Sequence, residues 1–177
     1  MNLEKNLFSE FASLLPQKVY ERLNDESISN HLIEIVLDYG FYPKFRFNNQ
    51  EELELTDLNK LSKDDLQQIC NQLPPFGDDN RTGIDSTLHR ISALRNRQHE
   101  VIGLTIRMGR AFEGSLAALE KKLASGKNIL FLAPPGFGKT TKLREASRLL
   151  ASTYNKRVMI VDSSNEIAGS GDIPHPC

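Results

Sequence analysis

A segment with the residue types and spacing of a phosphate-binding loop lies at residues 128–146, "NILFLAPPGFGKTTKLREA". Its residues 133–140 fit the pattern [AG]-x-x-x-x-G-K-[ST]. Gly138 lets the backbone come close to phosphate oxygens, and the successive N–H groups and the start of the following helix attract an anion. In such a loop Lys139 bridges the β- and γ-phosphates and Thr140 holds Mg²⁺ through its hydroxyl. The segment therefore predicts a nucleotide-phosphate site.

The whole loop is assigned to this predicted site. The expected cofactor-binding residues are Ala133, Pro134, Pro135, Gly136, Phe137, Gly138, Lys139, Thr140 and Thr141. Lys139 is the candidate catalytic residue and Thr140 the candidate metal ligand. Ala133 stands where glycine is usual, but it ends a strand, and a methyl group is tolerable there if φ stays negative. Gly136 and Gly138 keep the flexible half of the loop.

The elements expected to position the loop form one βαβ unit. The apolar pattern predicts a strand over 128–132, a helix over 139–153 and a second strand over 157–162. A further helix is expected over 114–126, where Gly126 provides the stop. The sequence thus predicts an α/β fold around the loop.

The first part of the chain has a different character. Helices are expected over 3–15 and 17–25, interrupted at Pro16, followed by two or three short strands within 31–55. A capping box, Ser62 with Asp65, predicts a helix from residue 62. A hairpin is expected over 86–110, with "NRQH" as its turn. The composition changes near residue 110, so we expect a small α+β domain over 1–110 and a nucleotide-binding domain over 111–177.

The hairpin is rich in arginine. It carries Arg90, Arg95, Arg97, Arg107 and Arg110. Such a basic ribbon could contact the phosphates of a nucleic acid, or it could be the solvated face of a sheet. The sequence leaves both interpretations open.

The composition is that of an ordinary globular chain. The 177 residues have a net charge of −1 and are 39% hydrophobic, so the total charge does not favour a nucleic-acid or membrane partner. No apolar run is long enough to cross a bilayer, and the acidic N-terminus is neither a secretory signal nor a good transit peptide. Cys70 lies on the apolar side of its predicted helix and Cys177 is terminal, so no disulfide framework is implied.

Several polar residues follow the second expected strand. Asp162 ends that strand and could be taken for a Mg²⁺-holding Walker B aspartate, although in the large ATPase division of this fold that residue belongs to the third strand. Glu166 is a candidate for positioning water or sensing phosphate, or is simply a turn carboxylate. Asp172, His175 and Cys177 lie close in sequence, but one histidine and one cysteine indicate a metal only weakly.

Four segments of the chain resemble one family. They are "FGDDNRTGIDSTLHRISALRNR", "VIGLTIRMGRAFEG", "GKNILFLAPPGFGKTTKLRE" and "KRVMIVDSSNEIAGSGDIPHP". They are similar to a family of P-loop ATPases of plastid genomes and cyanobacteria, catalogued as hypothetical chloroplast reading frame forty-five. That family is related to stage III sporulation protein AA and, more distantly, to secretion-type ring ATPases. The family loop usually reads G-R-P-G-V-G-K-T-T, so Ala133, Pro134 and Phe137 are departures.

The resemblance implies more than the residues alone. It implies ATP and Mg²⁺ as cofactors, a plastid location in a chloroplast or cyanelle stroma, an AAA-type ATPase fold and ring assembly in full-length relatives. It also implies that family members continue past residue 177, so the fold expected here is a P-loop NTPase core cut after its second strand. The two core strands would then expose apolar faces, and turnover by these residues would be negligible. Arg107 and Arg110 are candidates for contacting nucleotide, by analogy with secretion-type relatives.

Three functions remain open at this point. The chain is an ATP-binding protein of the plastid family, a single-stranded nucleic-acid-binding module that uses its basic hairpin, or a non-functional fragment. The process that it serves does not follow from the sequence.

Overall fold

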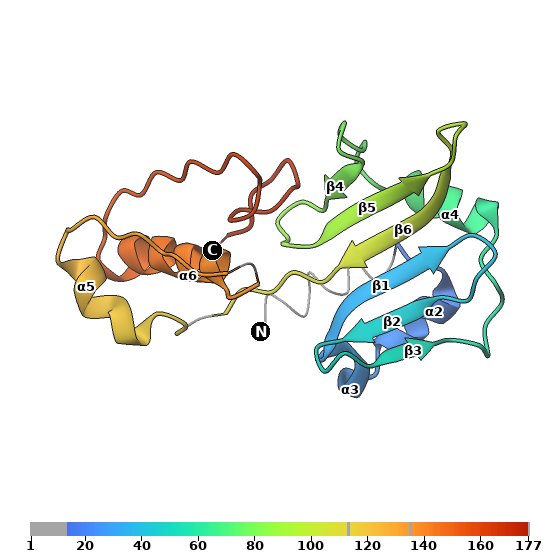
Figure 1. The fold of residues 1–177 in the computed structure, drawn as a ribbon, viewed down its shortest axis with the longest axis horizontal. Coiled ribbons are helices and arrows are strands. Elements are labelled where there is room, and N and C mark those ends of the chain that lie inside the picture. Colours follow the sequence, from blue (N-terminus) through green and yellow to red (C-terminus); the bar gives the residue numbers. More distant parts are fainter. Residues whose placement is uncertain (1–13, 113, 135, 177) are drawn as a thin grey trace.

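A computed structural model describes residues 14–112, 114–134 and 136–176. Most of the helix expected over 3–15 lies outside this range, as do Pro135 and Cys177. Figure 1 shows a broad sheet with helices behind it and, beside the sheet, a second group of helices joined by long loops.

One sheet of six antiparallel strands organises the first part of the chain. Its strands lie in the order β3-β2-β1-β6-β5-β4. They are β1 (Leu32–Asp38), β2 (Lys44–Phe47), β3 (Glu52–Glu54), β4 (Arg81–Gly83), β5 (Arg90–Arg95) and β6 (Val101–Arg107). The expected short strands and the expected hairpin, which is β5–β6, are confirmed. Central β6 pairs with β1, so segments far apart in sequence meet at the middle of the sheet.

Helices cover one face of this sheet and leave the other open. They are α2 (Gln17–Leu23), α3 (Glu26–Ser29) and α4 (Lys63–Cys70), with α2 and α4 behind the strands in Figure 1. The capping box at the start of α4 is confirmed: the Ser62 side chain accepts from the Asp65 N–H, and the Asp65 carboxylate accepts from the Ser62 N–H. The core between the layers contains Val19, Leu23, Leu32, Ile35, Leu37, Phe45, Leu66, Ile69, Ile91, Leu104 and Ile106. Alternation along the strands brings the strand residues of this core to one face of the sheet, and α2 and α4 supply Val19, Leu23, Leu66 and Ile69 from the other layer.

The second part of the chain has a smaller core. It contains η1 (Ala117–Leu119), α5 (Glu120–Ala124), α6 (Lys139–Arg148) and η2, a π-helical end of α6 (Leu149–Thr153). Leu116, Leu123 and Ala146 are its buried apolar residues. Gly126 ends the segment with φ +69°, as the sequence predicts for a helix stop. The domain boundary near residue 110 stays a prediction.

The two strands expected beside the loop do not form. Residues 128–132 and 157–162 belong to no sheet among the described residues, so the prediction of a formed βαβ unit is wrong here. Alternate apolar side chains face outward, with Leu130 and Leu132 88% and 90% exposed and Met159 and Val161 88% and 86% exposed. A strand needs a neighbour whose backbone groups bond to its own, and no described strand pairs with either segment. The exposed apolar faces implied by the family resemblance are therefore present.

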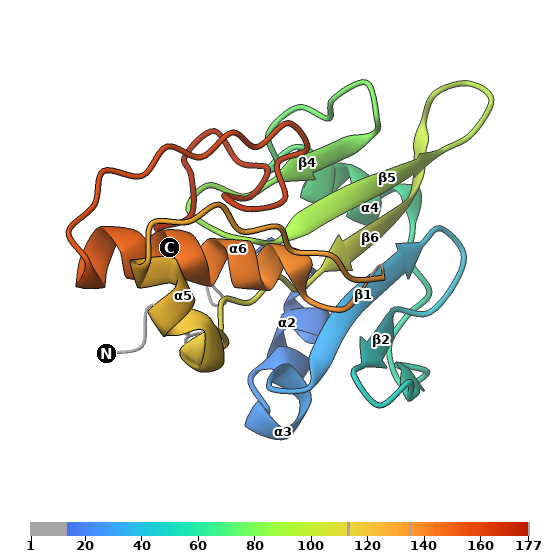
Figure 2. The same cartoon turned by 60° about the vertical axis from the view of Figure 1, so that its left-hand side comes forward.

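The chain after α6 returns to the sheet, and we call residues 162–175 the return loop. Figures 1 and 2 both show it arching back from the end of α6 to β4. The Ser86 N–H donates to the Ile173 carbonyl at 2.8 Å, and the Ile173 N–H donates to Asp85 Oδ1 at 3.1 Å. The return loop therefore ties α6 to the β4–β5 connection.

We expect Gly171→Ala to lower the free energy of unfolding by about 2 kcal/mol, the cost of inserting a methyl group into a packed contact. A Cβ at residue 171 would lie 2.8 Å from backbone atoms of Ile84 and Asp85, which cannot move independently. Urea unfolding measures the change. Gly77→Ala is the matched control, because its Cβ would first meet the Asp79 side chain at 3.2 Å. Equal stability of the two variants would contradict the tight contact.

Candidate functional site

The predicted phosphate loop leads directly into α6. Gly136 and Gly138 both adopt left-handed backbone, with φ of +80° and +73°. No atom of the described residues lies within 4 Å of a Cβ built on either glycine, so the backbone angle and not the space requires glycine there. Gly138 is the N-cap of α6, and no side chain in the described part of the chain caps the first turn. The N–H groups at the start of a ten-residue helix therefore remain available to an anion.

The Lys139 side chain folds back over this loop. Its Nζ donates to the carbonyl oxygens of Ala133, at 2.7 Å, and Pro134, at 2.9 Å. The residue that replaces the usual glycine therefore takes part through its backbone, and its methyl group is no obstacle to this contact. The ammonium group lies at the loop, where phosphate oxygens could replace the two carbonyls as its acceptors. Phe137 is exposed, and Thr141 follows in the first turn of α6.

Thr140 contacts the return loop. Its hydroxyl donates to Glu166 Oε2 at 2.9 Å. The Arg144 guanidinium, one turn further along α6, donates to the carbonyl oxygens of Glu166 and Ile167 at 2.7 Å each. The structure thus brings together the two predicted residues Thr140 and Glu166, which are 26 positions apart in sequence.

Asp162 shapes the return loop by accepting backbone hydrogen bonds. Its carboxylate receives the N–H groups of Glu166, Ile167 and Ala168 at 2.7–3.2 Å. Burial alone would raise the pKa of Asp162, but these N–H donors and that of Ser164 favour the carboxylate and bring its pKa below the ordinary value. Asp162 therefore holds Glu166 in place beside Thr140, and its oxygens are occupied by the loop.

A basic cleft of ≈ 260 Å³ lies between α6, the return loop and the sheet. Its charged and hydroxyl-bearing lining includes Arg90, Arg107, Arg110, Thr140, Arg144 and Glu166. Three of the four arginines come from the β5–β6 hairpin and its continuation, whereas Thr140 and Arg144 come from α6. Arg110 and Arg144 already donate to the carbonyl oxygens of Ser29, Glu166 and Ile167. Four arginines against one glutamate still give the lining of the cleft an excess of positive charge, which favours an anion.

Two of these arginines lie directly opposite each other. Arg90 of β5 pairs with Arg107 of β6 in the register of the sheet, and like charges in that position destabilise a sheet. Burial and the guanidinium groups of Arg81 and Arg107 lower the pKa of Arg90, which Glu166 and Asp79 partly offset. Arg90 Nε is buried and hydrogen-bonds no group among the described residues. An anion in the cleft would relieve this repulsion.

A histidine is buried next to this arginine pair. His89 is 6% exposed, and its Nδ1 accepts the Gly109 N–H at 3.2 Å. Burial, followed by the charges of Arg110 and His175, lowers the pKa of His89 to about 4. His89 is therefore neutral at physiological pH, with the proton on Nε2, and supports the backbone beside the cleft.

The arginines of the hairpin do not form one ribbon. Arg95 bonds Asn80 and the His99 carbonyl near the turn, whereas Arg90, Arg107 and Arg110 lie at the cleft. This division does not favour nucleic-acid binding. Among residues 14–112, 114–134 and 136–176, no three metal-ligating side chains gather into a metal-binding group. Within the same ranges, every helix is too short or too polar to cross a bilayer.

Sequence reasoning found some of these residues and missed others. It named Lys139, Thr140 and Glu166, and it named Arg107 and Arg110 by analogy. It missed Arg144, although the spacing of four residues from Thr140 places both on one face of a helix. It also missed the supporting roles of Asp162 and His89, for which the local sequence contains no signal.

Comparison with known proteins shows homologues from plastids. The chain is 46% identical over 163 residues to a protein of Porphyra purpurea described as uncharacterised, ycf45, and 39% identical over 170 residues to ycf45 of Cyanidium caldarium. It is 43% identical over 165 residues to the protein SEEDLING PLASTID DEVELOPMENT 1 of Arabidopsis thaliana. These alignments cover 92%, 96% and 93% of this chain, but 28%, 50% and 24% of the respective relatives. No family model matches. The homologues confirm the expected plastid location.

Solved structures show the same fold at much lower identity. The ATPase DotB of Legionella pneumophila has a TM-score of 0.51 at 15% identity, with 77% of this chain and 43% of DotB covered. The pilus retraction motor PilT with bound ADP has a TM-score of 0.55 at 18% identity, with 75% and 43% covered. The expected fold class is thereby confirmed. The chain is a homologue of the ycf45 proteins over about 28–50% of their length, and its fold is similar to that of part of DotB and of PilT.

Proposed function

We propose that this chain binds the triphosphate of ATP, with Mg²⁺, through the loop of residues 133–140. The observation that carries the proposal is the position of the arginine-lined cleft. Thr140, the predicted metal ligand, lines this cleft together with Arg90, Arg107 and Arg110. A triphosphate held by the loop would extend its terminal phosphate past Thr140 into this positive field.

Each group in the site has a role in this proposal. Lys139 exchanges its two carbonyl acceptors for phosphate oxygens. Thr140 would hold Mg²⁺ through its hydroxyl oxygen, and the ion would offset the negative charge of the phosphates. Arg90 and Arg107 neutralise the terminal phosphate, and Glu166 is placed to orient a water molecule near it. The residues therefore fit both ATP and Mg²⁺.

The neighbours of known structure support the fold that the proposal requires. DotB is an ATPase and PilT is a motor with bound ADP. The fold match includes less than half of either chain, so it supports the fold and not the activity. Ring assembly, which the family resemblance implies, belongs to the proposal, as does nucleotide binding itself.

Calorimetric titration with Mg²⁺–ATP tests the proposal. We expect saturable binding at one site, with inorganic triphosphate as a competitor, because the contacts go to phosphates. Absence of saturable binding up to millimolar nucleotide would overturn the proposal. If single-stranded oligonucleotides bind with a steep salt dependence while ATP does not, the basic hairpin is a nucleic-acid site instead.

The proposed role of Thr140 as the Mg²⁺ ligand can be tested by substitution. We expect Thr140→Ala to remove most of the gain in ATP affinity that Mg²⁺ provides, about tenfold or 1.4 kcal/mol. Thr140→Ser is the matched control, since it keeps the hydroxyl oxygen and should keep the Mg²⁺ effect. The measurement is the ratio of ATP dissociation constants with and without EDTA. The same ratio in Thr140→Ala as in the unmodified chain would remove Thr140 from the metal site.

A further inference from the structure

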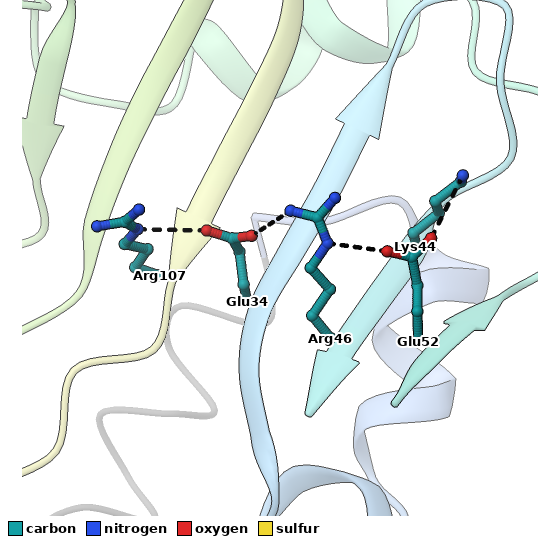
Figure 3. Close-up of polar contacts among 5 residues, drawn as sticks. All are labelled: Glu34, Lys44, Arg46, Glu52 and Arg107. Carbon is teal, nitrogen blue, oxygen red and sulfur yellow. Dashed lines mark hydrogen bonds and ion pairs between the residues drawn. The ribbon is translucent and has the colours of Figure 1, made fainter. Parts of the chain in front are cut away.

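An unbroken row of charged side chains crosses the open face of the sheet and ends at the cleft. In the register of the strands, Arg90 pairs with Arg107, Arg107 with Glu34, Glu34 with Arg46, and Arg46 with Glu52. Figure 3 shows the part of this row from Arg107 to Glu52. Its signs are positive, positive, negative, positive and negative. Charges alternate from Arg107 outward, and the like pair lies only at the cleft.

Glu34 is the fixed member of this row. Its side chain is 13% exposed, and its two carboxylate oxygens have separate partners. Oε2 accepts from Arg46 at 2.7 Å, and Oε1 accepts from Arg107 Nε at 3.2 Å. Arg46 is itself bonded to Glu52 at 2.9 Å. Arg46 of β2, itself bonded to Glu52 of β3, thus holds the Glu34 carboxylate in place from the strands farther from the cleft.

Arg107 depends on Glu34 for its position. Its side chain is 62% exposed, so packing alone does not fix its conformation. Among the described residues, Glu34 is the hydrogen-bond partner of the Arg107 side chain and uses only Nε. The two terminal nitrogens are left for an anion in the cleft. An arginine ordered before binding loses less conformational entropy when it contacts a phosphate.

We propose that Glu34 is a positioning residue for the terminal phosphate, because it holds Arg107 at the cleft and so lets the chain distinguish a nucleoside triphosphate from a diphosphate. This inference rests on the proposed nucleotide binding at residues 133–140. Without Glu34, repulsion from Arg90 turns Arg107 away from the cleft. The phosphates of ADP are held by the loop and lie before the arginine pair, so ADP affinity does not depend on this contact.

Positioning by Glu34 can be told apart from a simple effect of its charge, because the two predict different changes in nucleotide affinity. Glu34 is also a negative charge near an anion site, and its mere neutralisation would strengthen the binding of ATP and ADP together. Positioning instead predicts that the ratio of the ADP and ATP dissociation constants falls. Glu52→Gln is the matched control, because it removes one carboxylate charge from the same row and leaves the Arg107–Glu34 contact intact.

The experiment compares Mg²⁺–ATP and Mg²⁺–ADP affinities in the unmodified chain, Glu34→Gln and Glu52→Gln, and repeats Glu34→Gln in an Arg107→Gln background. We expect Glu34→Gln to lower the ADP-to-ATP ratio about threefold to tenfold, the range of one modest ion pair. Glu52→Gln should leave the ratio unchanged. In the Arg107→Gln background, Glu34→Gln should have no further effect, since the two residues act as one unit.

Distinct results overturn the inference and the function on which it rests. If the unmodified chain does not bind ATP, the proposed function and the inference both fail. If it binds ATP but Glu34→Gln and Glu52→Gln alter the ratio equally, or Glu34→Gln leaves it unchanged, only the inference fails. Should Glu34→Gln not fold, Glu34→Asp replaces it, because the shorter side chain keeps the charge but withdraws the carboxylate from Arg107: a lowered ratio supports the inference, and an unchanged ratio overturns it.

Discussion

Lys139→Ala is expected to weaken Mg²⁺–ATP binding about 100-fold, which corresponds to about 2.7 kcal/mol. The ammonium group would donate charge-assisted hydrogen bonds to phosphate oxygens, and such bonds contribute about 1.5–3 kcal/mol each. In the structure the same group donates to two carbonyl oxygens of a partly exposed loop. The free energy of unfolding should therefore change by less than about 0.5 kcal/mol. Calorimetric titration and urea unfolding of the same preparations measure the two quantities.

Lys142→Ala provides the control for this prediction. Lys142 is on the same helix and carries the same charge, but its Nζ bonds the Ser115 carbonyl at 2.9 Å. We expect the ATP affinity of Lys142→Ala to stay within about threefold of that of the unmodified chain, because a charge that does not contact the phosphates is screened by salt. Equal losses in the two variants would show that total helix charge, and not the loop contact, governs binding.

Acidification from pH 7 to pH 5 is expected to lower the free energy of unfolding by about 2 kcal/mol through His89. The pKa of His89 is about 4 in the folded chain, against an ordinary value of 6.5. Between these values the unfolded chain binds a proton that the folded chain does not, so stability is complete above pH 6.5 and falls as the pH decreases. Protonation would also remove Nδ1 as the acceptor of the Gly109 N–H. Urea unfolding at several pH values measures the slope.

Two further measurements assign the effect to this residue. His89→Gln should flatten the slope between pH 6.5 and 5, while His31→Gln, at an exposed position, should leave it unchanged. In NMR titration of the folded chain, the His89 ring signals should change with a midpoint near pH 4. A midpoint near 6.5 would contradict the burial of His89 next to Arg110 and His175.

The sequence predicted most of the sheet because its signals are local. The alternation of Leu104 and Ile106 with polar neighbours specifies the buried face of β6, and the capping box at Ser62 specifies where α4 begins. The antiparallel pairing of β1 with β6 could not be predicted in the same way, since the two segments are about 70 residues apart. That pairing places Glu34 beside Arg107, and it depends on the shared core and not on either segment alone.

Local sequence patterns predicted the loop at 133–140 correctly but not the two segments beside it. The left-handed backbone at Gly136 and Gly138 and the start of α6 at Lys139 could be predicted, because they depend on the residues at these positions. The segments at 128–132 and 157–162 have the apolar composition of strands but do not become strands, because a strand is completed by its neighbour's hydrogen bonds. An apolar composition favours a strand, but the strand forms only when a neighbouring strand pairs with it.

By itself, the sequence determined the left-handed glycines of the loop at 133–140, the apolar faces and the resemblance to the ycf45 proteins, because these depend on residue type and short spacing. Only the tertiary structure decided how the site is assembled. It brought the hairpin arginines into one cleft with Thr140, placed Glu166 on the Thr140 hydroxyl through Asp162 and Arg144, and fixed Arg107 through Glu34. Apart from the local hydrogen bonds of Asp162, these side-chain contacts join residues 22 to 73 positions apart. Their geometry comes from the packing of the return loop and the sheet, which no local pattern records.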